Sequence, residues 1–413
     1  MKFRLITFLM LTGFSLALGF FIRDRTQNKV KAEVSFPGNS VEVPFETYGN
    51  HLFLQGKLNN TVTHDLLLDS GAADIFLSQS KAQAFHLKSV GKSYIPGGTT
   101  GQVFTNRVKG VTLKLGALTL QDRESVVIPT AETNKLSHFF GRTVTGIVGY
   151  ELFQQHVVEL DYQNQVLRFH RPQTYRYPGK AKPIPMKVEG ERPYIEITVS
   201  PYGYPALKGS FMIDLGSGGA VLLATGCGLN QKLIAAAPKI LVRKLSTIHG
   251  ADNIHLGRAQ KVQIAQQSID NPIAVLPQMQ TTDCDRATGN IGNQILRQFK
   301  VIFNYPHRQL ILEPNSEPRP KDPYEYDLSG LWIQATGANF KTYRIETVYP
   351  NTPAAKAGIQ SGDVLKEING RPTTQLNLSQ IRQQLSQVGK NIQLVVERAA
   401  KPIQTSFMLK SLL

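Results

Sequence analysis

Residues 65–78, DLLLDSGAADIFLS, place one acid inside an otherwise apolar stretch of the chain. Three leucines lead into Asp69, Ser70 and Gly71 follow it, and an apolar segment resumes at Ile75. A carboxylate in a low-dielectric interior is costly unless it is paired or hydrogen-bonded. Asp, Ser and Gly are also common turn residues, so a single copy of this pattern predicts only a tight turn.

The same pattern occurs again in residues 209–223, GSFMIDLGSGGAVLL. An apolar run leads into Asp214, and Leu215, Gly216 and Ser217 follow before the apolar pattern resumes. The second copy therefore keeps the acid and the glycine of the turn, but it has leucine where the first copy has serine.

A second pair of segments repeats in the same order. GIVGYELFQQHVVELDYQNQVLRF starts at residue 146, and GNIGNQILRQFKVIFNYPHRQLIL starts at residue 289, so that Gly149 aligns with Gly292 without gaps. Each copy predicts a glycine corner, a short helix and two strands joined by a turn. Two motifs that recur at nearly the same spacing indicate two related lobes. Short stretches with period-two alternation, such as HLFLQGKL at 51–58, predict that these lobes consist mainly of strands.

Paired Asp turns in repeated β lobes, each followed by an apolar-apolar-Gly corner, resemble the bacterial retropepsin-like aspartyl proteases with a C-terminal PDZ domain. The resemblance covers residues 45–413. It implies a mainly β protein in which two related pepsin- or retropepsin-like β-barrel lobes form a bilobal acid protease, followed by a small α/β PDZ domain. It also implies that Asp69 and Asp214 are the catalytic pair. Two carboxylates a few Å apart share one proton, so one activates a water molecule while the other polarises the peptide carbonyl.

The resemblance assigns further parts of the active site. Gly149 and Gly292 would lie beneath the two catalytic turns, where a side chain would displace them. The glycine-rich hairpin tip at 97–101 would be a flap that closes over the substrate. The residues expected to support the catalytic turns are Ser70, Gly71, Gly216 and Ser217. The residues expected to form the flap are Gly97, Gly98, Thr99, Thr100 and Gly101.

The difference between the two turns bears on how the lobes are joined. In the resembled family, the hydroxyl after each catalytic Asp reaches the backbone of the opposite turn. Ser70 can make this contact, whereas Leu215 has no polar side-chain atom. We therefore expect a half-clasp held by Ser70 and supported by apolar packing of Leu215. Two functions stay open: an aspartic endopeptidase, or a catalytically weak or inactive peptide-binding scaffold that retains the protease fold.

The segment VYPNTPAAKAGIQSGDVLKEINGRP, residues 348–372, resembles a PDZ domain. Its Asn369-Gly370 pair predicts a hairpin turn. The resemblance implies that the loop at 329–333 holds the C-terminal carboxylate of a peptide, which adds as a strand to the sheet edge. A helix over 379–388 would line the groove. The loop residues expected to bind the peptide are Gly330, Leu331, Trp332 and Ile333.

The first 32 residues have the pattern of a secretory signal or a membrane anchor. Lys2 and Arg4 precede an apolar run over 5–22, and small residues up to Ala32 offer a cleavage site. Either alternative predicts an exported protein, periplasmic or membrane-anchored, with the protease body outside the cytoplasm. The net charge of +16 is spread along the chain without a basic run, which argues against a nucleic-acid partner.

The expected domains are the N-terminal lobe at 33–172, the C-terminal lobe at 173–320 and the PDZ domain at 329–413. The spacing of Cys227 and Cys284 leaves open whether they form a disulfide. No histidine or cysteine pattern has the spacing of a metal site, so we predict no metal and no cofactor. The expected partners are a peptide or protein substrate and a C-terminal peptide on the PDZ domain, with the membrane added if the N-terminus is retained.

Overall fold

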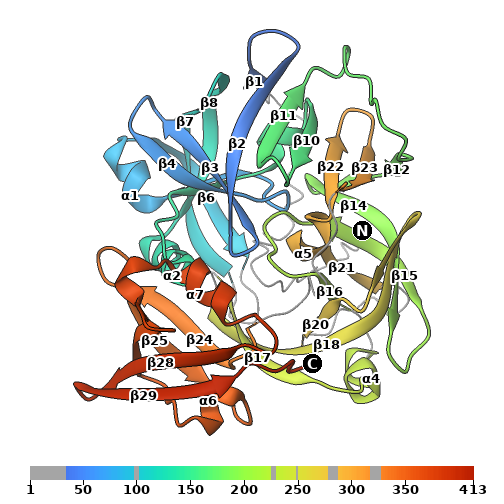
Figure 1. Cartoon of the computed structure of the whole chain (residues 1–413). Helices are drawn as coiled ribbons and strands as arrows, with labels where there is room; N and C mark the ends of the chain where they lie inside the picture. Colours follow the sequence, from blue (N-terminus) through green and yellow to red (C-terminus); the bar gives the residue numbers. More distant parts are fainter. Residues whose placement is uncertain (1–33, 97–101, 225–228, 248–249, 278–286, 317–326) are drawn as a thin grey trace, which may run out of the picture. The chain divides into compact units, whose positions relative to one another are not determined.

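The computed structural model describes residues 34–96, 102–224, 229–247, 250–277, 287–316 and 327–413 (Figure 1). The expected signal or anchor, the expected flap at 97–101, and both Cys227 and Cys284 lie outside the described residues. The chain divides into two compact units. The first unit contains Met1–Glu132 and Val144–Arg319, and the second contains Thr133–Thr143 and Pro320–Leu413.

The first lobe consists of strands with three short to medium helices among them. Its elements are β1 (Val34–Ser35), β2 (Ser40–Tyr48), β3 (His51–Leu58), β4 (Thr63–Leu68), β5 (Ile75–Ser78), α1 (Gln79–Ala84), β6 (Lys88–Pro96), β7 (Gln102–Leu115), β8 (Leu118–Ile128), α2 (Thr130–Phe140), β9 (Gly146–Val148), α3 (Tyr150–Phe153), β10 (Val157–Asp161) and β11 (Val166–His170). Helix α2 was not predicted from the sequence.

The second lobe has a similar order of elements. They are β12 (Ile184–Pro185), β13 (Lys187–Glu189), β14 (Arg192–Pro201), β15 (Leu207–Ile213), β16 (Val221–Ala224), α4 (Leu229–Ala236), β17 (Leu241–Thr247), β18 (Gly250–Ile264), β19 (Gln267–Asp270), β20 (Ile273–Pro277), β21 (Ala287–Ile291), α5 (Asn293–Leu296), β22 (Phe299–Asn304) and β23 (Gln309–Pro314). The mainly β fold that the sequence predicted is confirmed.

The repeat is visible in the pairing of the strands around the two acids. Strand β4 runs parallel to β9, and β9 runs antiparallel to β5. In the second lobe, β15 runs parallel to β21, and β21 runs antiparallel to β16. Leu68 pairs with Val148 in the first lobe, as Ile213 pairs with Ile291 in the second. These apolar residues are buried, which explains why both acids follow continuous apolar runs.

A shared sheet joins the two lobes into one unit. Strand β10 of the first lobe pairs antiparallel with β22 of the second, with Val157 opposite Asn304. Figure 1 shows β10 and β11 in green beside β22 and β23 in orange. The sheet continues from β22 to β23 and β12 on one side, and from β10 to β11 and β2 on the other. Leu160 and Val301 are fully buried in this pairing, so apolar burial as well as hydrogen bonds holds the lobes together.

The C-terminal unit is a small sheet with two helices and a helical turn. Its elements are β24 (Leu331–Thr336), β25 (Thr342–Val348), α6 (Pro353–Lys356), β26 (Val364–Ile368), β27 (Arg371–Pro372), η1 (Thr373–Gln375), α7 (Leu378–Gln384), β28 (Asn391–Arg398) and β29 (Lys401–Met408). The strands follow the order β24-β25-β26-β28-β29, with β27 paired to β26, so β24 lies at an edge.

Two sequence predictions in this unit have different outcomes. The hairpin turn is confirmed, since Asn369 and Gly370 have φ angles of 51° and 73° between β26 and β27. The helix predicted over 379–388 is shorter and ends at Gln384. Its start is fixed by a capping box at Asn377, and the chain then turns through Gly389, which has a φ angle of 77°. Within the ranges described above, no helix is long and apolar enough to span a membrane.

Candidate active site

The two acids follow equivalent strands and have the same backbone contacts. The N–H of Asp69 donates to the carbonyl of Val148 at 2.9 Å. The N–H of Asp214 donates to the carbonyl of Ile291, also at 2.9 Å. Because the strand pairing and these hydrogen bonds repeat, each acid occupies the same place in its lobe. Both side chains are fully buried.

Each carboxylate is oriented by the glycine two residues later. The N–H of Gly71 donates to Oδ1 of Asp69 at 2.7 Å, and the N–H of Gly216 donates to Oδ1 of Asp214 at 2.9 Å. A Cβ atom at Gly216 would lie 2.6 Å from Oδ1 of Asp69. The second turn therefore lies directly against the first acid, and only glycine permits this approach.

The electrostatic environment favours a neutral Asp69. Burial raises the pKa of Asp69 well above its ordinary value, and the charge of Asp214 raises this pKa further. The N–H of Gly71 and the charge of Arg192 act in the opposite direction. Burial and a nearby like charge both disfavour the ionised form, so the pair is suited to holding one proton between two carboxyl groups.

The glycines expected beneath the turns leave no space for a side chain. A Cβ atom at Gly149 would overlap the carbonyl of Asp69 and lie 2.6 Å from that of Ala72. A Cβ atom at Gly292 would lie 2.7 Å from the carbonyl of Ser217. A side chain at either position would therefore displace the adjacent aspartate turn.

The half-clasp expected from the sequence is present. The hydroxyl of Ser70 donates to the carbonyl of Ile213 at 2.6 Å and accepts the N–H of Leu215 at 2.9 Å. Leu215 is fully buried and offers no hydroxyl in return. Instead, Nε of Arg192 donates to the carbonyl of Gly71 at 2.8 Å. A charged side chain of the second lobe thus contacts the first turn.

Reciprocal contacts run from the first lobe to the second turn. The side-chain amide of Asn50 donates to the carbonyl of Gly218 at 3.3 Å. A Cβ atom at Gly218 would lie 3.0 Å from Nε2 of His51. His51 begins β3, just as Arg192 begins β14, so each lobe contacts the opposite turn from the start of the corresponding strand.

One side chain distinguishes the two carboxylates from each other. The amide nitrogen of Asn290 donates a short hydrogen bond to Oδ2 of Asp214. Asn290 pairs with Met212 in β15, in the register where Ile147 pairs with Leu67 in the first lobe. Ile147 has no donor, so Asp214 gains a hydrogen bond that has no counterpart at Asp69. A donor of this kind stabilises an ionised carboxylate.

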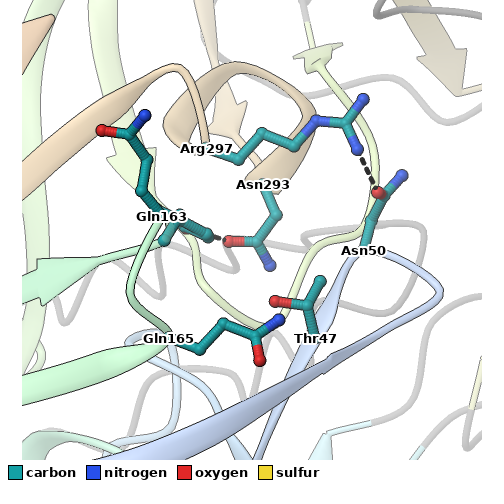
Figure 2. A pocket seen from close by; sticks show the side chains of 7 residues that line it. Thr47, Asn50, Gln163, Gln165, Asn293 and Arg297 are labelled. Atoms are coloured by element: carbon teal, nitrogen blue, oxygen red, sulfur yellow. Dashed lines mark hydrogen bonds between the residues drawn. The ribbon is translucent and has the colours of Figure 1, made fainter. Parts of the chain in front are cut away.

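A polar cavity of about 270 Å³ lies next to the second turn (Figure 2). Its lining residues are Thr47, Asn50, Tyr162, Gln163, Gln165, Asn293 and Arg297. Figure 2 shows Arg297 donating to Asn50, at 2.9 Å, and Asn50 in turn contacts the second turn. Asn293 accepts the hydroxyl of Tyr162 at 2.6 Å and donates to the carbonyl of Leu215 at 2.7 Å. Two chains of hydrogen bonds therefore hold the second turn in place.

Several of these residues were not predicted as site residues. Four side chains contact one of the two aspartate turns or its acid, yet none belongs to the repeated Asp motif: Arg192, Asn50, Asn290 and Asn293. A signal for Asn290 is present in the sequence. The gapless alignment of the two glycine corners places a polar Asn290 opposite the apolar Ile147, where a purely structural repeat would keep an apolar residue.

The loop expected to bind a peptide carboxylate in the C-terminal unit already holds a carboxylate. Oδ2 of Asp327 accepts the N–H groups of Gly330 and Leu331, both at 2.9 Å, and Oδ1 accepts that of Ser329 at 3.1 Å. Burial raises the pKa of Asp327, while these hydrogen bonds lower it. The N–H groups of this loop are therefore directed at a side chain of the same chain.

The remaining loop residues, Trp332 and Ile333, lie on the edge strand β24. The backbone beside them is also specialised, because Gly330 has a φ angle of 81° and a Cβ atom there would overlap Thr352. Nowhere in the described ranges do three or more His, Cys, Asp or Glu side chains form a group that could hold a metal ion.

Comparison with known families agrees with this architecture. Residues 54–152 match the model of the aspartyl protease family, and residues 344–398 match the model of the PDZ domain. The first match includes Asp69 and Gly149. The chain thus carries an aspartyl protease-like domain followed by a PDZ domain, as the sequence predicted.

The chain is also similar to a curated bacterial protein, the regulator of sigma-E protease RseP of Escherichia coli (strain K12). The two sequences are 32% identical over 95 residues, which is 23% of this chain. The aligned segment spans 20% of the length of that protein, so the similarity concerns one part of each chain.

Proposed function

We propose that this protein is an aspartic endopeptidase that hydrolyses peptide bonds through a water molecule activated by Asp69 and Asp214. The observation that carries the proposal is the pair of fully buried acids on equivalent turns, with Gly216 of the second turn against the carboxyl of Asp69. An arrangement that raises the pKa of one acid beside another is typical of a catalytic pair rather than of a structural one.

The asymmetry around the acids supports distinct starting roles. Asp69 holds the shared proton, because burial and the second carboxylate raise its pKa. Asn290 donates to Asp214, which favours the ionised carboxylate, and Asp214 acts as the general base. Water loses a proton to Asp214 as its oxygen attacks the carbonyl carbon, and Asp69 gives its proton to the carbonyl oxygen.

The second half of the reaction restores the starting state. The tetrahedral diol collapses as its C–N bond breaks, and the amine leaves with the proton held by Asp214. One hydroxyl of the diol returns its proton to Asp69 as the new carboxyl group forms. The two acids therefore exchange protons with the substrate without net change, and no cofactor enters these steps.

We also propose the wider setting of this activity. The substrate is a peptide or protein, and the PDZ domain recruits it or regulates its cleavage. The charged and apolar pattern of residues 1–32 supports export, with the protease body in the periplasm or held at the outer side of the membrane.

The alternative is a peptide-binding scaffold that keeps the protease fold with weak or no activity. The observation that favours this alternative is Leu215, whose side chain has no hydroxyl to form the second half of the clasp between the two turns. Digestion of a peptide library by the purified full chain, from acidic to neutral pH, separates the two functions. Cleavage products that disappear with both Asp69→Asn and Asp214→Asn support the peptidase. Peptide binding without cleavage at any pH supports the scaffold.

A further inference from the structure

A segment that lies within the sequence of the first lobe belongs structurally to the PDZ unit. Thr133–Thr143, which includes most of α2, groups with Pro320–Leu413 rather than with the strands that precede and follow it in the chain. Leu136 and Phe140 of this segment are almost fully buried. The PDZ unit therefore includes a piece of chain from far outside its own sequence.

The ring of Phe139 contacts one side chain of β24 and one side chain of α7. The rings of Phe139 and Trp332 are 5.7 Å apart, with an interplanar angle of 37°. The guanidinium of Arg382 in α7 lies 4.7 Å from the centre of the Phe139 ring, within the range of a cation–π contact. Arg382 also donates to the carbonyl of Ile333 at 3.1 Å, which links α7 to β24 around this ring.

The glycine that follows brings the backbone against the same two elements. Gly141 has a φ angle of 67°, and a Cβ atom there would lie 2.9 Å from Cβ of Leu378 in α7 and 3.1 Å from Cβ of Ala335 in β24. A second aromatic contact flanks it, since His138 and Phe340 have ring centres 6.1 Å apart. The left-handed backbone and the close approach both require glycine, so the end of α2 fits this surface closely.

Both parts of the expected peptide site are thus filled from within the chain. The loop amides that would receive a carboxylate are bonded to Asp327, and the surface between the edge strand and α7 is covered by residues 138–141. We propose that residues 138–141, His-Phe-Phe-Gly, are a built-in ligand of the PDZ groove. By this proposal the groove recognises an internal aromatic-glycine segment rather than a free C-terminus, and an external peptide must displace this segment in order to bind.

The chain provides its own reporter for a test. Trp332 is the single tryptophan of the protein and lies in the groove itself. The full chain is titrated with a peptide of residues 130–143 that is acetylated and amidated, so that it has no free carboxylate, while the fluorescence of Trp332 is recorded. The experiment measures PDZ binding and does not depend on peptide hydrolysis.

We expect the wild-type chain to bind this peptide weakly, because its groove is occupied. Phe139→Ala should loosen the built-in ligand and raise the affinity at least tenfold, and a peptide that carries the same change should not bind. Phe104→Ala is the matched control, since Phe104 is 78% exposed and lies in the other unit. Arg382→Gln in the Phe139→Ala background should remove the gained affinity.

An unchanged affinity in Phe139→Ala would overturn the proposal, as would tighter binding of a peptide that differs only in having a free C-terminus. If Phe139→Ala does not fold, Gly141→Ala provides a second route. Its Cβ atom meets α7 and β24, so it should displace the segment and raise the affinity in the same way. Equal affinities of Gly141→Ala and wild type would again overturn the proposal.

Discussion

The two aspartate turns have the same backbone hydrogen bonds and differ in their side chains. Both acids follow a strand paired in the same way, and both accept the N–H of the glycine two residues later. The first turn contributes the hydroxyl of Ser70 to the contact between the lobes, whereas the second turn contributes the buried Leu215. A duplicated fold can therefore keep its geometry while the polar groups around the two acids diverge.

The divergence is compensated by residues outside the turns. Arg192 supplies a hydrogen bond to the first turn, and Asn290 supplies one to the second acid. Because each compensation comes from a different element, the two carboxyl groups have different surroundings although their backbones are alike. The following predictions test how far this difference matters.

The largest effect is expected from removing either acid. Asp69→Asn and Asp214→Asn should each lower kcat by about 10²–10⁴-fold, since general acid–base catalysis of this kind contributes roughly that factor per group. Stability should not fall, because a neutral amide at either position avoids the cost of a buried ionisable carboxyl group. Steady-state hydrolysis and thermal melting of both variants check this. A folded variant with substantial activity would remove that acid from the mechanism.

The next largest effect concerns the half-clasp. Ser70→Ala leaves the carbonyl of Ile213 and the N–H of Leu215 without this partner, so we expect a loss of roughly 1–3 kcal/mol in the free energy of unfolding. Activity should fall as well, because the two turns lose the hydroxyl contact that Ser70 makes between them. Urea denaturation and hydrolysis assays measure both effects.

A second buried serine provides a control that distinguishes the effect of the clasp from the effect of losing any buried hydrogen bond. Ser125 is fully buried and donates to the carbonyl of Ile75 within the first lobe, at 2.9 Å. Ser125→Ala should therefore cost a similar amount of stability and leave kcat unchanged. If the two variants lose activity equally, the contact of Ser70 has no special relation to the catalytic turns.

The raised pKa of Asp69 predicts a pH dependence of stability. The folded protein holds this proton more tightly than the unfolded chain, whose Asp has a pKa near its ordinary value of 3.8. The contribution of Asp69 to stability is therefore fully present below that value and is lost as the pH rises through the folded pKa. The slope is at most about 1.4 kcal/mol per pH unit. Unfolding free energies of wild type and Asp69→Asn from pH 4 upward measure it, and identical slopes would contradict the shift.

A smaller effect is expected from making the surroundings of the two acids more alike. Asn290→Leu removes the donor to Asp214 and places an apolar residue where the first lobe has Ile147. We expect kcat to fall about tenfold, which is about 1.4 kcal/mol in activation free energy. The acidic limb of the plot of hydrolysis rate against pH should move to higher pH, because Asp214, the proposed general base, is protonated more readily without this donor. Ile147→Leu, the control, should leave the profile in place.

The smallest effect is expected from restoring the second hydroxyl. Leu215→Thr can complete the clasp, but it also loses apolar burial at a fully buried position. The change in unfolding free energy should therefore stay within about 1 kcal/mol, while the loss caused by Ser70→Ala should shrink in the double variant. A double-mutant cycle measures this coupling, and additive effects would show that residue 215 does not take part in a clasp.

Local sequence patterns predicted two related lobes, the paired acids and the position of the half-clasp. These features depend on local patterns: apolar runs before Asp69 and Asp214, glycines where backbones meet, and a serine without a matching hydroxyl. The hairpin at Asn369 was predicted for the same reason, because a two-residue turn with positive φ angles restricts the residue types that fit.

The other side chains that contact the acids, and the unit to which most of α2 belongs, depend on contacts between segments that are distant in sequence. Arg192 and Asn290 reach the turns because strands distant in sequence pair beside them, and no local pattern specifies that approach. Phe139 reads as part of the first lobe in the sequence, yet it packs on Trp332 in the PDZ unit. The physical reason is that the hydrophobic effect is non-directional and does not depend on distance in the sequence. The partner that covers an aromatic ring is therefore determined by the surfaces that meet in the folded protein.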